Sequence, residues 1–153
     1  FVLNIDGVPF IDEPGSFEVI DGDHSDLRAY FEKFAKKNGI KLDENEEQIS
    51  HKFIRGDHYS FVQAGIPSFL IQEGRLPVNK PLEEYTWLKY IYTSNIYHSP
   101  FDDLHQFINY DAVAGFAKIL LNFILFMDKE VDSPKMKRES PYCSEYLKLR
   151  RTN

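Results

Sequence analysis

The 153-residue sequence contains a single cysteine, Cys143. One cysteine excludes both an internal disulfide and a zinc site built from cysteines. The sequence also lacks a run of Lys and Arg placed where it could follow phosphates, and its formal net charge is -6. A nucleic-acid-binding function is therefore disfavoured on electrostatic grounds.

Long apolar runs are absent as well. A membrane-spanning helix needs roughly 20 apolar residues, and the longest run here, around Ile119–Met127, is shorter and predicts a buried helix face. No positively charged leader precedes the first apolar segment, Phe1–Ile5. Because the chain begins inside what reads as a strand, we expect it to be part of a longer protein. An export signal would then lie upstream of Phe1.

What the chain has in abundance is aromatic residues, with 13 Phe and 9 Tyr. Such a composition argues against a disordered tail and predicts a domain with a real core. Phe1–Ile5, Ser16–Ile20 and Ser68–Gln72 are typical of strands, and the last of them follows a short helical stretch, His58–Ala64, and a Gly. This order is typical of an α/β sheet.

Apolar residues at helical spacing predict two longer helices. The first begins at Leu27, with Ser25 as its N-cap and Gly39 as its stop. The second is Tyr110–Met127, with Asn109 as its cap and a broad apolar face built on Val113, Phe116, Leu120, Phe123 and Ile124.

Arg75–Asn95 reads as a long excursion with one helical turn, and such loops commonly carry function. We expect residues 1–130 to form the domain. Residues 131–153 are expected to form a tail laid over its surface and anchored by Tyr142, Tyr146 and Leu147.

Three polar clusters follow predicted strands or turns, where α/β proteins place their sites. Asp6 comes directly after an apolar strand and precedes a Gly that permits close backbone approach. His98 is followed by Ser-Pro, so its ring is expected to stand out from regular structure, with Asp102 and Asp103 nearby. Taken singly, Asp6 is more often a turn residue and His98 a surface histidine.

The third cluster is Asp57-His58. It reads either as a helix N-cap followed by a solvent-facing histidine, or as a carboxylate–imidazole pair that orders a site. Considered in isolation, the pair favours the cap.

The order and spacing of the clusters point to one family. Two stretches carry the resemblance, DHYSFVQAGIP (Asp57–Pro67) and YHSPFDDL (Tyr97–Leu104), preceded by LNID (Leu3–Asp6). In this order they resemble the C-terminal half of the M28 family of zinc aminopeptidases, from Leu3 to about Met127. The resemblance implies a three-layer α/β/α sandwich with a mixed central sheet, of which the N-terminal half is missing. The habit of the family also favours a periplasmic or secreted location.

The resemblance also implies a site with two zinc ions about 3.5–4 Å apart that clamp an activated water. Asp6 matches the later aspartate that binds one zinc, and His98 matches the final histidine that binds the other. Tyr97 sits where some members steady the oxyanion, a role that its O–H can fill. Asp57 matches a carboxylate that supports the metal site, although Gly56 replaces the usual preceding Ser.

The other ligands implied by the family are a His and a bridging Asp of an HxD motif and a Glu-Glu pair that includes the general base. None of them precedes Asp6, and Glu46-Glu47 and Glu83-Glu84 come later in polar segments. Two ligands on opposite metals do not close a dizinc site. We therefore expect a peptide-hydrolysing aminopeptidase whose missing N-terminal half is a required partner, and we expect this chain alone to be inactive.

Two alternatives on the same fold remain open. A glutaminyl-cyclase-like enzyme would keep one zinc, but its pattern usually has Trp where this chain has Tyr97. A non-catalytic binding module would have no need to retain both Asp6 and His98.

Overall fold

The structure is a computed structural model, and it describes residues 1–7, 11–21, 23–43, 52–130 and 133–151. Three strands of the described chain form one sheet: β1 (Val2–Asn4), β2 (Phe17–Ile20) and β3 (Ser68–Glu73). β3 lies in the middle, parallel to β1 and antiparallel to β2. The predicted α/β class and mixed sheet are confirmed, with all three strands where the sequence predicted them.

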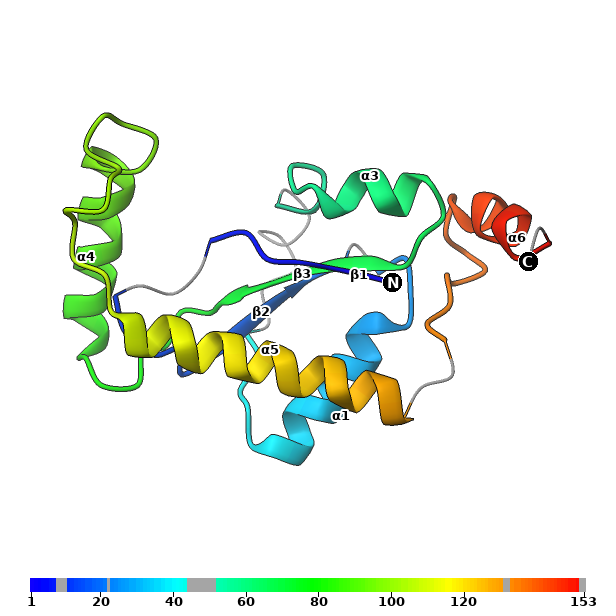
Figure 1. Ribbon diagram of the computed structural model, residues 1–153, viewed down its shortest axis with the longest axis horizontal. Coiled ribbons are helices and arrows are strands. Elements are labelled where there is room, and N and C mark those ends of the chain that lie inside the picture. The colour runs from blue at the N-terminus through cyan, green and yellow to red at the C-terminus, as the bar shows by residue number, and fades with distance from the viewer. Residues whose placement is uncertain (8–10, 22, 44–51, 131–132, 152–153) are drawn as a thin grey trace.

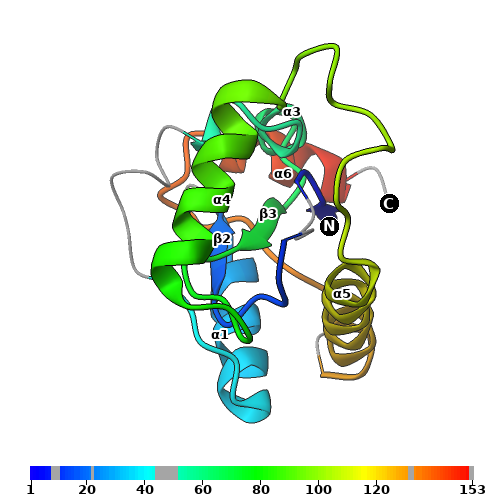
Figure 2. The same cartoon turned by 90° about the vertical axis from the view of Figure 1, so that its left-hand side faces the viewer.

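Helices lie on both faces of this sheet (Figure 1). Along the described part of the chain, the helices are α1 (Leu27–Asn38), α3 (His58–Gln63), α4 (Leu82–Asn95), α5 (Tyr110–Glu130) and α6 (Cys143–Arg151). α1 and α5 cover one face, whereas α3 lies over the other. α4 packs on neither face and stands across one end of the sheet (Figure 2).

Strand β3 distributes its side chains between two cores, as the two-residue period of a strand requires. Phe69 and Ile71 point into the larger core, which α1 and α5 complete, while Leu70 points to the α3 side. The larger core is rich in aromatic rings. Phe123 of α5, for example, packs edge-on against Phe31 with their ring centroids 5.0 Å apart. The many Phe residues of the sequence therefore serve mainly to fill this core.

Helix α5 confirms the predicted helix and its cap, since the Asn109 side-chain oxygen accepts a hydrogen bond from the Ala112 N–H. Its predicted apolar face is wrong at one position: Phe116, Leu120 and Phe123 are buried, but Ile124 is exposed. Phe126 and Met127 are buried as well, so the buried face is displaced around the helix axis from the predicted one.

By length and composition alone, α5 is also apolar enough to cross a membrane, which the count of consecutive apolar residues did not predict. It is the one such helix in the described part of the chain. One face of α5 lies against the sheet, and 28% of the apolar window is buried.

Helix α1 ends as predicted at Gly39, whose φ of 66° is a left-handed conformation that favours glycine. Its predicted N-cap is wrong. Asp26 occupies the cap position without a side-chain cap bond, and the Ser25 hydroxyl accepts a long hydrogen bond from the Leu27 N–H instead. Ser25 thus makes a local turn contact just outside the helix.

Helix α4 corrects the expectation of a single helical turn in Arg75–Asn95, because it spans 14 residues. Within α4, all of which is described, only Tyr85 is buried, and large apolar residues such as Trp87 and Tyr90 are exposed. A helix without a clear apolar stripe lacks the periodic signal that identifies an amphipathic helix. This is why the sequence did not reveal it.

The segment beyond α5 contacts the smaller core. Met136 is buried in the smaller core, and Tyr142 and Tyr146 pack against that core. The Tyr142 hydroxyl also lies 3.1 Å from the hydroxyl of Tyr59, at hydrogen-bond distance. Leu147, predicted as an anchor, is exposed.

Candidate functional site

The candidate site lies at the end of the sheet where β1 and β3 finish. Because the two strands are parallel, their carboxyl ends meet at one edge, which is where α/β proteins usually bind ligands. Asp6 follows β1, and Glu73 ends β3. The Gln72 side-chain amide donates to the Asp6 carbonyl at 2.8 Å and so ties the two strand ends together. Gly7, with a φ of 77°, then turns the chain away.

A cavity of about 640 Å³ opens at this edge. It brings together Asp6, Tyr97 and His98, although Asp6 follows the first strand and the other two follow α4. The complete lining is Asp6, Gly7, Lys52, Gln72, Glu73, Lys89, Tyr92, Thr93, Tyr97, His98, Asp102, Gln106 and Ile108. Three of the four predicted site residues thus share one cavity.

His98 is held in an unusual conformation. Its φ of 58° lies in the left-handed region, which is uncommon for a residue with a Cβ. Its ring stacks on the ring of Tyr97, with centroids 3.8 Å apart and planes 21° apart. Backbone strain of this kind is often found at functional sites. The conformation and the stacking together define the direction of the imidazole.

Asp102 organises the loop that carries His98. One carboxylate oxygen accepts the His98 backbone N–H at 3.2 Å, and the other accepts the Gln106 side-chain amide at 3.0 Å and the Tyr92 hydroxyl at 3.4 Å. These contacts fix the backbone of the loop, and the one to His98 involves its N–H and not its ring. Asp103 makes a similar local contact, accepting the His105 N–H at 2.8 Å.

Asp57 lies outside the lining of this cavity. It is exposed at the N-terminus of α3 and makes no side-chain cap bond. Its neighbour His58 is fully buried, which corrects the interpretation of a solvent-facing histidine. Both ring nitrogens of His58 and Oδ2 of Asp21 are buried without a hydrogen-bond partner among the described residues. Burial lowers the pKa of His58 below its ordinary value of 6.5, and the carboxylates of Asp21, Asp57 and Asp6 offset part of that effect.

The buried imidazole predicts a loss of stability in acid. Because the pKa of His58 is lower in the folded state, the unfolded state binds more protons between the folded pKa and 6.5. The free energy of unfolding should therefore decrease as the pH falls below 6.5. His58→Leu should remove this part of the pH dependence, as measured by urea unfolding at about pH 7.5 and about pH 5.5. His105→Asn, at an exposed histidine, serves as the control. An unchanged pH dependence in His58→Leu would contradict the prediction.

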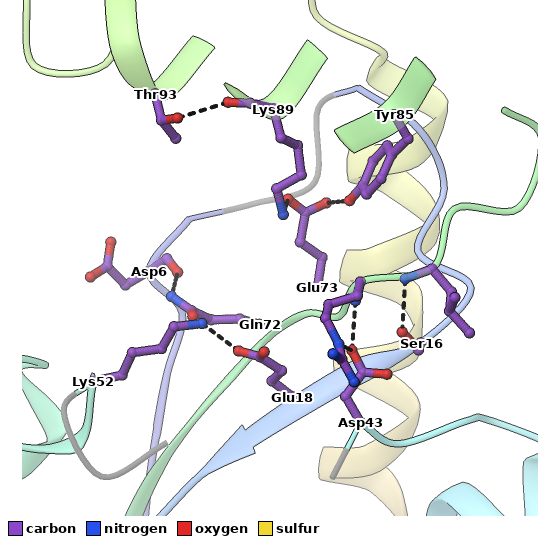
Figure 3. Close-up of polar contacts among 12 residues, drawn as sticks. Asp6, Ser16, Glu18, Asp43, Lys52, Gln72, Glu73, Tyr85, Lys89 and Thr93 are labelled. Atoms are coloured by element: carbon purple, nitrogen blue, oxygen red, sulfur yellow. Dashed lines mark hydrogen bonds and ion pairs between the residues drawn. The ribbon is translucent and has the colours of Figure 1, made fainter. Parts of the chain in front are cut away.

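The cavity contains ion pairs that were not predicted from the sequence. Glu73 forms an ion pair with Lys89 at 2.8 Å, and Lys52 pairs with the buried Glu18 of β2 (Figure 3). Glu73 is a carboxylate at the end of an apolar strand. The same position marked Asp6 as a candidate, so the sequence does carry a signal for Glu73. The two lysines carry no such signal, because only the folded chain brings them to the cavity.

The side chains of the cavity include ligand types that zinc prefers. A carboxylate and an imidazole are common zinc ligands, and Asp6 and His98 line the same cavity. Within the described residues, however, no group of three or more His, Cys, Asp or Glu side chains is placed to hold a metal. Asp6 and His98 alone therefore do not complete a metal site.

Residues 1–124 match the model of peptidase family M28. The chain belongs to this family, as the motifs around Asp57 and His98 predicted. Neither the search of curated proteins nor the search of solved structures found a match. The family establishes a peptidase-type function for the domain.

Proposed function

We propose that the cavity is one side of the active site of a zinc-dependent aminopeptidase, which releases N-terminal residues from peptides. The observation that carries this proposal is that Asp6 and His98 line a single cavity in a chain of peptidase family M28. Two zinc ions, when bound, supply a water acidic enough to act as a nucleophile at neutral pH. Asp6 is proposed to bind one ion and His98 the other.

Two further residues have supporting roles in this proposal. Tyr97 is half exposed at the cavity wall, so its hydroxyl is free to donate to the oxyanion that develops on the peptide carbonyl. Asp57 is proposed to support the metal site from outside the cavity, through its negative charge at the start of α3. The remaining ligands and the general base come from an N-terminal half that completes the three-layer sandwich. The 153-residue chain alone is therefore expected to be inactive. We also propose that the full-length protein acts in the periplasm or outside the cell.

Metal removal tests the proposal directly. The natural full-length protein that contains these residues should hydrolyse aminoacyl-nitroanilides, lose that activity with a chelator, and regain it when zinc is added back. The same preparation is assayed for cyclisation of an N-terminal glutamine, which a glutaminyl-cyclase-like enzyme would catalyse. Hydrolysis that survives complete removal of zinc would rule out the metallopeptidase.

A further inference from the structure

Glu73 links the end of β3 to helix α4 through both of its carboxylate oxygens. One accepts a hydrogen bond from the Tyr85 hydroxyl at 2.9 Å, and the other pairs with Lys89 at 2.8 Å (Figure 3). The Lys89 amine also lies over the Tyr85 ring, 5.4 Å from its centroid. The Glu73 side chain is only 12% exposed, so these charge-assisted contacts are poorly screened by water. We call these three residues the α4 clamp.

The clamp matters because α4 has little other burial. Tyr85 is the helix's one buried residue, and it lies in the first turn. Just before the helix, the buried Asp12 accepts the backbone N–H groups of Asn79 and Lys80 at 2.8 and 2.9 Å. Both attachments hold the beginning of α4. Its last turn is exposed and leads directly into Tyr97 and His98.

Because these contacts hold the beginning of α4, a small tilt there displaces the far end of the helix. Ten residues separate Tyr85 from the end of the helix at Asn95, which corresponds to about 15 Å at a rise of about 1.5 Å per residue. A tilt of about 10° at the clamp would move the far end by about 2.6 Å over that length. A zinc–nitrogen bond is about 2.0–2.1 Å long, so such a shift is enough to remove a ligand from a metal.

We infer that Glu73 is a positioning residue for the cavity: by clamping Tyr85 and Lys89, it sets the tilt of α4 and thereby the place of His98 relative to Asp6. The inference rests on the proposed zinc site and adds to it a residue that touches no metal. The same clamp also places Tyr92 and Thr93 of α4 on the cavity wall.

The test of the clamp is the zinc affinity of the natural full-length protein. This affinity is measured by competition with a chromophoric chelator. Tyr85→Phe keeps the buried ring and removes the hydroxyl, while Glu73→Gln keeps the shape and removes the charge. Each should weaken zinc binding about 10-fold or more, within the range of about 10–100-fold seen when groups that orient metal ligands are lost. Lys89→Gln changes a partly exposed side chain, is expected to fold normally, and should weaken binding in the same direction.

Asp43→Asn is the matched control. The Asp43 side chain is 8% exposed and shares a cavity wall with Tyr85 and Lys89, but its hydrogen bond, at 2.6 Å to the backbone N–H, and its ion pair are both to Arg75 in the loop after β3. It should lower the melting temperature of the metal-free protein without changing zinc affinity. Clamp variants that bind zinc within about twofold of wild type would overturn the inference and leave the zinc site standing. Equal weakening by Asp43→Asn would also overturn it, by tracing the effect to stability. A wild-type protein that binds no zinc would overturn both proposals.

Discussion

Replacing His98 with asparagine in the natural full-length protein should abolish most of the peptidase activity. Loss of groups that merely orient a metal ligand costs about 10–100-fold, so loss of a ligand should lower kcat/KM by about 100-fold or more. Asparagine is preferred to alanine because it tolerates the left-handed backbone, with its φ of 58°, that His98 adopts. The measurements are kcat/KM on an aminoacyl-nitroanilide and the zinc content of the purified variant.

His105→Asn is the control for this substitution. His105 is an exposed histidine of the same loop but lies outside the cavity lining. It should retain wild-type turnover and zinc content. If His98→Asn also retained near-wild-type turnover, the assignment of His98 as a metal ligand would be wrong.

Truncating Phe123 to alanine should cause a large loss of stability. The ring is fully buried and packs against Phe31, Phe34 and Phe69, with centroids 5.0, 5.5 and 5.7 Å away. Removing a buried Phe ring costs about 3–5 kcal/mol, because transfer free energy is lost and a cavity remains. Urea unfolding of the 153-residue chain, followed by circular dichroism, measures the change.

Ile124→Ala on the next residue of α5 is the matched control. Ile124 is 44% exposed, so its truncation should change the free energy of unfolding by about 0.5 kcal/mol or less. Equal losses for the two variants would mean that the buried stripe of α5 is wider than the structure has it.

Elements with a periodic pattern of apolar residues were predicted from the sequence, and an element held by contacts to other parts of the chain was not. β3 and α5 were recognised from the sequence because their apolar residues repeat at the period of the structure they form. α4 was not, because its apolar residues are spread around the helix and only Tyr85 is buried. What holds α4 is a set of contacts to Asp12 and Glu73, which are remote in sequence and leave no periodic pattern.

The candidate site divides in the same way. Asp6 was marked by its place after an apolar strand, and Tyr97 and His98 by a family motif; all three line the cavity. The exposure of His58 was predicted wrongly, because a polar residue beside a helix start is usually solvated. Here α3 turns it toward the sheet, where it is fully buried.

The sequence by itself therefore determined the α/β class, the strands, the family and the residues that carry the proposed chemistry. These depend on residue type and on spacing along the chain, which a sequence contains directly. The tertiary structure alone decided which side chains share the cavity, which stripe of α5 is buried, and how Glu73 holds the helix that leads to His98. Those features depend on contacts between residues far apart in the chain, and such contacts exist only after the elements pack.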